Sequence, residues 1–264
     1  MPISNNGVAY HLSGPKGKPT VALIHGLGLN RHITWEEIEP VLAQRYRVLN
    51  YDLLGHGESA LPQSKPDLTM LSRQLIKLMD ELSIDRVAAV GFSLGGMINR
   101  RMAIDYPDRV SSLIILNSPH ERGEEAQRLV EERLKDTQEG GAEATIDATL
   151  KRWLTVDFIA QRKAKLERIK NIVLANDKEN YANHRYILAH GVKELIRPTP
   201  EISIPALVMT SEHDSGSTPA MSEGISNEIT DSEIYMVPGL KHLGLIEQPD
   251  IFADKITDFL YRKL

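Results

Sequence analysis

Short apolar runs alternate with amphipathic stretches over the first half of the chain. The runs lie at residues 20–24, 46–50, 86–90 and 112–117. They are rich in β-branched side chains, which is typical of strands covered on both faces. Over residues 68–82, leucines recur at spacings of three and four, so one face of a helix is apolar there. This order predicts right-handed βαβ units and a mostly parallel sheet with helices on both faces, an α/β fold.

The alternation breaks off in the middle of the chain and returns near its end. From about residue 122 to residue 194 the sequence is charged and has helical spacing without a strand pattern. Strand patterns resume at residues 204–210 and 233–237. We therefore predict an α/β core formed by residues 1–121 and 195–264, with residues 122–194 inserted as a helical lid. A helical insertion with no role at the site is the alternative.

Composition and charge narrow the range of partners. The 264 residues include 31 basic and 36 acidic side chains, no long basic run and no cysteine. This balance argues against binding to nucleic acid or to an anionic membrane surface, and the lack of cysteine excludes thiol catalysis. The N-terminus has no signal-peptide pattern, and no apolar run approaches the ~20 residues of a membrane span. We expect a cytoplasmic protein that acts on a small molecule.

One turn carries the strongest chemical signal. Residues 91–95 read G-x-S-x-G and lie between the apolar run at 86–90 and a helical stretch. A strand, this motif and a helix in that order form a nucleophile elbow. Gly91 and Gly95 allow the sharp turn, and Ser93 is then held at a helix N-terminus, where negative charge is favoured. The pattern predicts that Ser93 is a catalytic nucleophile, although the same motif also occurs in ordinary loops.

A nucleophilic serine needs a base and a third group that orients the base. Asp214 and His242 follow Ser93 in chain order. Each follows a predicted strand, at the carboxyl edge where open α/β sheets place their sites. Among nine histidines, only His242 lies in a late loop beyond the acid. Glu212 and Asp231 are rival acids, but Asp214 stands just before a Gly-Ser turn and is favoured.

Backbone N–H groups are expected to complete this site. The two donors of an oxyanion hole would be the N–H of Leu94, after the nucleophile, and that of Leu27, in the loop after the first buried strand. Gly26 and Leu27 are then expected beside the substrate. Gly26 and Gly28 also suggest a dinucleotide-binding loop, but Arg31 stands where that motif has its third glycine. We therefore expect no cofactor.

The remaining histidines are expected to be structural. His56 lies between two glycines and is predicted to stabilise its loop. His184 and His190 are six residues apart, a spacing that does not place them on one helical face. We therefore predict no metal site in this segment.

With these residues placed, the chain resembles the α/β-hydrolase superfamily over nearly its full length. The matching pieces are His25-Gly26, Asp52-x-x-Gly55-His56-Gly57-x-Ser59, the elbow, Glu212-His213-Asp214 and the His242 loop. Within the superfamily the chain is most similar to 3-oxoadipate enol-lactonases and their esterase relatives, in the stretches 148–155 and 242–249. The resemblance implies hydrolysis of a small carboxylic ester or lactone without a cofactor.

Several alternatives stay open at this point. The elbow also fits carbon–carbon bond hydrolases and cofactor-free haloperoxidase or perhydrolase-like enzymes, and a ligand receptor on a hydrolase scaffold is the non-enzymatic alternative. Serine rather than aspartate at position 93 argues against haloalkane dehalogenases. Trp153 shares helical spacing with Ile146 and Leu150 and is either part of the lid core or an apolar wall over Ser93. The resemblance favours the wall.

Overall fold

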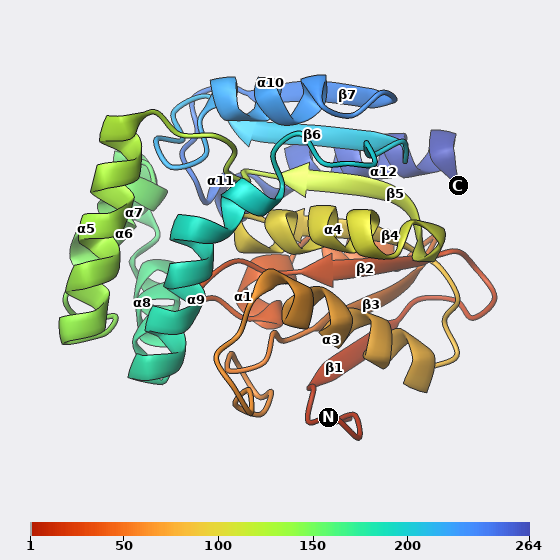
Figure 1. Cartoon of the computed structure of the whole chain (residues 1–264), viewed down its shortest axis with the longest axis horizontal. Coiled ribbons are helices and arrows are strands. Elements are labelled where there is room, and N and C mark those ends of the chain that lie inside the picture. The colour runs from red at the N-terminus through yellow and green to blue at the C-terminus, as the bar shows by residue number, and fades with distance from the viewer. Residues whose placement is uncertain (1) are drawn as a thin grey trace.

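The computed structural model describes residues 2–264, so Met1, where the predicted core begins, lies outside the described residues. The strands are β1 (Tyr10–Ser13), β2 (Thr20–Ile24), β3 (Arg47–Tyr51), β4 (Val87–Phe92), β5 (Val110–Leu116), β6 (Ala206–Ser211) and β7 (Ser232–Val237). They form a seven-stranded sheet in the order β1-β3-β2-β4-β5-β6-β7 (Figure 1). Only β1 runs antiparallel to its neighbour. The predicted mostly parallel α/β sheet is therefore confirmed.

The helices lie around this sheet. They are α1 (Arg31–Trp35), α2 (Glu39–Leu42), α3 (Leu68–Glu81), α4 (Leu94–Asp105), α5 (Glu124–Gly140), α6 (Ile146–Trp153), α7 (Val156–Gln161), α8 (Lys163–Leu174), α9 (Lys178–His190), α10 (Pro219–Asn227), α11 (Gly244–Glu247) and α12 (Pro249–Lys263). Helices α3 and α4 cover one face of the sheet and α12 lies on the other (Figure 1). Within residues 2–264, none of the helices has the length and apolar character needed to cross a membrane.

Burial explains why the central strands form. Every residue of β2 and of β4 is buried, as expected of parallel strands that are covered by helices on both faces. The apolar stripe of α3 packs onto the same core, and the Asp67 side chain accepts a hydrogen bond of 2.6 Å from the N–H of Met70. This N-cap starts the helix at Leu68.

In one stretch, helix caps make the observed helices differ from the helix that the sequence pattern predicts. The pattern over residues 35–42 predicts one short helix, but the structure has α1 and α2 with a turn between them. Asn30 accepts a hydrogen bond of 3.0 Å from the N–H of Ile33 and so starts α1 early. Pro40 lies in the first turn of α2, where a missing N–H costs nothing, and begins a separate helix.

Helices α5–α9 form a block between β5 and β6 that we call the helical block (residues 122–194). The block lies beyond the carboxyl ends of the parallel strands (Figure 1). Gly141 has a positive φ of 70° and ends α5, at the glycine pair where the sequence indicates a break. The helical block therefore faces the edge of the sheet where the candidate catalytic residues were predicted.

The close approach of β4 and α4 predicts that a side chain at Gly91 destabilises the fold. A Cβ at Gly91 would collide with the backbone carbonyl of Gly95, which has no room to move. Gly91→Ala should therefore lower the free energy of unfolding by about 3 kcal/mol, as overpacking does. Gly123 is the matched control, since a Cβ there meets nothing within 4 Å. Chemical denaturation should show no more than about 1 kcal/mol of change for Gly123→Ala, the cost of a poorer N-cap for α5; equal effects at both sites would contradict this account.

Candidate active site

Ser93 sits in a strained turn between β4 and α4. Its backbone has φ 55° and ψ −111°, a region that non-glycine residues rarely occupy. The N–H of Ser93 donates to the carbonyl of Leu116 at 2.8 Å, which ties the turn to β5. A Cβ at Gly95 would collide with the carbonyl of Ile24 in β2. The turn therefore packs directly against two neighbouring strands, and glycine is required at Gly95.

The structure brings together the three residues that the sequence singled out. The Oγ of Ser93 lies 3.1 Å from Nε2 of His242, and Nδ1 of His242 lies 2.6 Å from Oδ2 of Asp214. The three side chains follow β4, β6 and β7, whose carboxyl ends meet at one edge of the sheet. All three residues are buried. Both hydrogen-bond distances lie in the range of a serine–histidine–carboxylate chain.

The Asp214 carboxylate is held in its charged form. Its Oδ1 accepts from the N–H groups of Gly216 at 2.8 Å and Ser217 at 3.0 Å. Its Oδ2 also accepts from Nδ2 of Asn117 at 2.9 Å. Burial alone would raise the pKa of Asp214, but His242 and these hydrogen bonds together hold it below its usual value. A charged acceptor fixes His242 with its proton on Nδ1, which leaves Nε2 facing Ser93.

Asn117 is a site residue that the sequence analysis missed. It lies directly after β5 and has a positive φ of 46°. Its position after a strand, at the same edge as Ser93 and Asp214, is the signal that could have identified it.

The rival acids lie elsewhere. The exposed carboxylate of Glu212 accepts from the N–H of Gly239 at 2.9 Å. Asp231 pairs with Lys263 at 2.9 Å. Within residues 2–264, neither carboxylate contacts His242. The geometry therefore favours Asp214 as the acid.

The loop after β2 lies against Ser93. A Cβ at Gly26 would lie 3.2 Å from the Cβ of Ser93, so Leu27 follows directly beside Ser93. In the part of the chain that the structure describes, the backbone N–H groups of Leu27 and Leu94 have no hydrogen-bond acceptor. Unpaired donors next to a serine are suited to bind an oxyanion.

A small cavity opens onto Ser93 and His242. Its volume is about 40 Å³. Leu27, Ser93, Pro119, Arg122, Arg152, Trp153, Arg185, Leu188, Gly216, Ser217 and His242 line it. The Trp153 ring is buried, and its centroid lies 5.8 Å from that of the His242 ring. Trp153 therefore belongs both to the packing of α6 and to the cavity wall.

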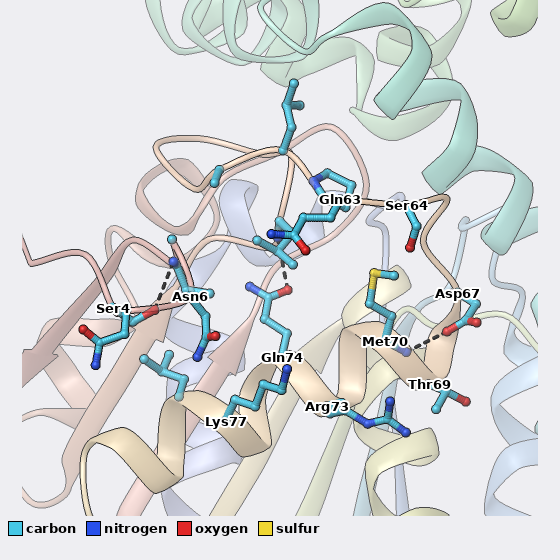
Figure 2. Close-up of a pocket in the computed structure, with 18 residues that line it drawn as sticks. Ser4, Asn6, Gln63, Ser64, Asp67, Thr69, Met70, Arg73, Gln74 and Lys77 are labelled. Carbon is cyan, nitrogen blue, oxygen red and sulfur yellow. Dashed lines mark hydrogen bonds between the residues drawn. The ribbon is translucent and has the colours of Figure 1, made fainter.

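A larger hollow lies elsewhere on the molecule and shares no lining residue with this cavity. Its volume is about 630 Å³, and Figure 2 shows it between α3 and the loops around Ser4 and Gln63. The side chains of Arg73, Lys77 and Asp67 contribute the charged groups of its wall. No histidine lines this hollow within the described residues. It therefore lacks the serine–histidine pair that distinguishes the smaller cavity.

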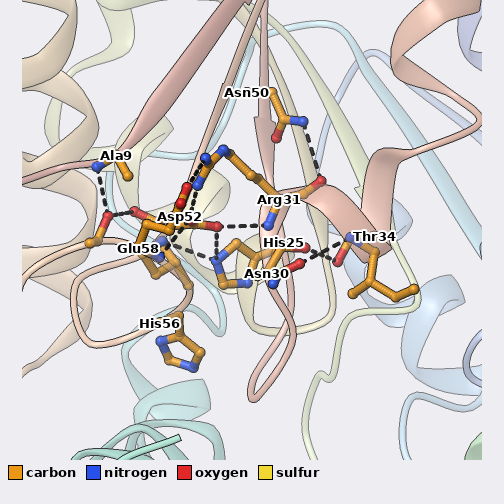
Figure 3. A network of polar contacts seen from close by, with 12 residues as sticks. Ala9, His25, Asn30, Arg31, Thr34, Asn50, Asp52, His56 and Glu58 are labelled. Atoms are coloured by element: carbon orange, nitrogen blue, oxygen red, sulfur yellow. Dashed lines mark hydrogen bonds and ion pairs between the residues drawn. The ribbon is translucent and has the colours of Figure 1, made fainter. Parts of the chain in front are cut away.

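Arg31, which stands in place of the glycine of a dinucleotide loop, is the centre of a buried ion-pair network (Figure 3). Its guanidinium pairs with the carboxylates of Asp52 and Glu58. The N–H of Arg31 also donates to Asp52 at 2.8 Å. The network joins the start of α1 to the loop after β3 and is structural.

Two buried histidines support the loop that carries Leu27. The N–H of Gly28 donates to Nε2 of His56 at 3.1 Å, and Nδ1 of His25 lies 2.8 Å from the carbonyl of Gly26. The His56 ring also contacts His184 of α9, with centroids 4.6 Å apart. His56 therefore stabilises its loop, and the loop beside the nucleophile with it.

These three histidines are held neutral. Burial lowers the pKa of His25, and it lowers the pKa of His184 to about 4. Burial, together with repulsion from His184 and His25, lowers the pKa of His56 well below its usual value. Only a neutral ring can accept the hydrogen bond from Gly28.

Comparison with known proteins identifies the family and agrees with the fold. A family model described as alpha/beta hydrolase fold matches residues 19–249. The chain is 27% identical to 3-oxoadipate enol-lactonase 2 of Acinetobacter baylyi, over 96% of this chain and 92% of that protein. It is 25% identical to (E)-2-((N-methylformamido)methylene)succinate hydrolase of the same species, over 95% and 93%. The crystal structure of the enol-lactonase from Burkholderia xenovorans LB400 superposes with a TM-score of 0.89, at 28% identity and over 96% of each chain.

The buried histidines predict how stability depends on pH. Unfolded histidine takes up a proton near pH 6.5, whereas native His184 does so only near pH 4. The stability from neutral His184 is therefore complete above pH 6.5 and is lost as the pH falls below it. His184→Phe should remove about 2 kcal/mol of the loss in unfolding free energy between pH 6.5 and 5.

Denaturant unfolding at several pH values measures this effect. His213 is the control, because its side chain is 59% exposed and lies outside the three-histidine contact. His213→Gln should leave the pH slope as it is in the parent protein. A slope that His184→Phe does not flatten would show that His184 is not kept neutral in the native state.

Proposed function

Because this chain belongs to the alpha/beta hydrolase fold family, we propose that it is a serine hydrolase that cleaves a small carboxylic ester or lactone. The observation that carries the proposal is the hydrogen-bonded chain from Ser93 through His242 to Asp214. The similarity to relatives that are named as enol-lactonases supports an ester or lactone bond as the target.

In the proposed reaction, Ser93 Oγ attacks the acyl carbon while Nε2 of His242 takes its proton. The N–H groups of Leu27 and Leu94 hold the oxygen of the tetrahedral intermediate. His242 then gives the proton to the leaving alcohol, which in a lactone stays joined to the acyl group. Asp214 stabilises the imidazolium and keeps its charge throughout. Water, activated by His242, hydrolyses the acyl-enzyme and restores Ser93.

We propose that the helical block acts as a lid over this site. Trp153 and Arg152 on α6 and Arg185 on α9 line the cavity beside Ser93. The cavity that these side chains cover is small, about 40 Å³. Movement of the helical block away from the sheet edge would widen the path of an ester to Ser93.

Substitution of the nucleophile tests the proposed function. Ser93→Ala should lower kcat on a short aryl ester by on the order of 10⁴-fold or more, because the acyl-enzyme is lost. A serine-directed organophosphate should inactivate the parent protein and add to Ser93, as seen by peptide mass spectrometry. Ser226→Ala, remote from His242 and paired with Ser232, is the control and should retain full activity. An inactivating adduct on another residue would overturn the assignment.

Fluorescence tests the place of Trp153 in the cavity wall. The chain has only two tryptophans, so in a Trp35→Phe background all indole emission comes from Trp153. A carboxylic acid product should quench or shift this emission saturably, with a midpoint equal to its inhibition constant. Trp153→Ala should also lower kcat/KM by an amount that depends on acyl size. An unchanged signal, with Trp153→Ala only lowering the melting temperature, would assign Trp153 to the packing of α6 alone.

A further inference from the structure

Three arginines from three segments of the helical block line the cavity beside Ser93. Arg122 precedes α5, Arg152 lies in α6, and Arg185 lies in α9. Arg185 is 4% exposed, so its charge is almost fully withdrawn from water. Segments that are distant in the sequence thus place positive charge at one point, next to the proposed nucleophile.

The hydrogen bonds of these arginines involve only neutral partners. Nη2 of Arg122 donates to the carbonyl of Leu188 at 3.1 Å, and Nη2 of Arg185 donates to the Tyr181 hydroxyl at 2.8 Å. The Nε atoms of Arg122 and Arg185 are buried without a partner. The Arg152 guanidinium lies against Gly216, where a Cβ would come within 2.8 Å of Nη1. Within residues 2–264, no carboxylate lies within ion-pair distance of any of the three.

Burial and repulsion from neighbouring arginines both act on the charges of Arg122 and Arg152. Burial lowers the pKa of Arg122 to about 10, and repulsion from Arg133 adds to the effect. Burial lowers the pKa of Arg152 to about 10 as well, with repulsion from Arg133 and Arg185. Asp214 is the nearby acid that opposes this effect on Arg152, but its oxygens are already taken by His242, Asn117 and backbone N–H groups.

Two other buried arginines show how the same fold treats a structural cation. Arg31 is fully buried and pairs with both Asp52 and Glu58. Arg100 is buried without a carboxylate partner among the described residues, but its guanidinium donates to two backbone carbonyls and to the Ser118 hydroxyl. In the same part of the chain the cavity arginines lack a carboxylate, and two of them also keep a buried Nε atom unbonded. Burying charge in this state is costly and an anionic ligand removes the cost, so these arginines are suited to an anion that is not part of the chain.

We propose that Arg122, Arg152 and Arg185 bind two carboxylate groups on the substrate, so that the natural substrate is an ester or lactone of a polycarboxylic acid. A single carboxylate would leave at least one of the three guanidinium groups uncompensated. Planar guanidinium groups bind carboxylates through paired N–H···O bonds, which also orient the acyl carbon toward Ser93. The inference rests on the proposed function and names its substrate class.

Three p-nitrophenyl esters test this by turnover: those of pentanoic acid, glutaric acid and tricarballylic acid, with zero, one and two free carboxylates. In the parent protein, kcat/KM should rise by on the order of tenfold with each carboxylate. Arg152→Gln and Arg185→Gln should each reduce the ratio of kcat/KM for the tricarballylate ester over the pentanoate ester by on the order of 10- to 100-fold. Arg162→Gln, at an exposed position of the same helical block, makes the same charge change and should leave that ratio unaltered.

A binding measurement separates this inference from the proposed function. Calorimetry with tricarballylate on Ser93→Ala protein should show saturable binding that Arg152→Gln weakens and Arg162→Gln does not. Because each substitution relieves repulsion, both arginine variants should fold, and a thermal melt checks this. If one variant does not fold, the other still tests the subsite.

The outcomes are distinct. Fastest turnover of the pentanoate ester, with no tricarballylate binding, would overturn the subsite and leave the hydrolase proposal standing. Tricarballylate binding without turnover of any ester would support the subsite and overturn the hydrolase proposal. Tighter binding of inorganic phosphate than of tricarballylate would overturn the assignment to carboxylates.

Discussion

The close contact of backbone with backbone at the Ser93 turn is the constraint on which the rest of the site depends. Gly91 packs against the carbonyl of Gly95, and Gly95 packs against the carbonyl of Ile24. With no side chain between them, β2, β4 and the start of α4 come close enough to hold Ser93 at a φ of 55°. The strain at Ser93 is offset by the packing of the fully buried strands β2 and β4, so the turn keeps this conformation without a ligand.

Around this turn the fold separates groups that must be charged from groups that must be neutral. Asp214 receives hydrogen bonds from four donors and keeps its charge, which fixes the tautomer of His242. Among the described residues, His56 has no carboxylate partner, and its ring stays neutral. Its Nε2 can therefore accept a hydrogen bond from the N–H of Gly28. One side of the site is thus oriented by a carboxylate and the other by a neutral ring, and both depend on burial.

The sequence contained enough to predict the sheet and to choose the three residues, because both follow from local pattern. Apolar runs mark the strands, and Ser93, Asp214 and His242 each follow one of them, so topology alone places them at one edge of the sheet. Asn117 obeyed the same rule and was missed because an asparagine has no distinctive motif. The sequence could not predict that the three cavity arginines lie together. They come from three segments of the helical block, and the spacing of residues does not show how these segments pack. The stretch 35–42 forms parts of two helices because Asn30 caps α1 and Pro40 starts α2. Hydrophobic periodicity does not show such helix starts.

The charges of the helical block bear on how it would move. Arg122, Arg152 and Arg185 lie on separate segments, and at the cavity Arg122 and Arg185 donate hydrogen bonds to neutral partners. Like charges there oppose the closed arrangement, and the opposition grows as water is excluded from between them. Trp153 acts in the other direction, because its ring is buried against His242 and its carbonyl accepts from the N–H of Leu243 at 2.9 Å. Apolar packing from α6 and repulsion between the arginines therefore balance within one cavity. Under the proposed function, an anion that neutralises the arginines would remove this repulsion and so favour the arrangement in which the helical block covers the cavity.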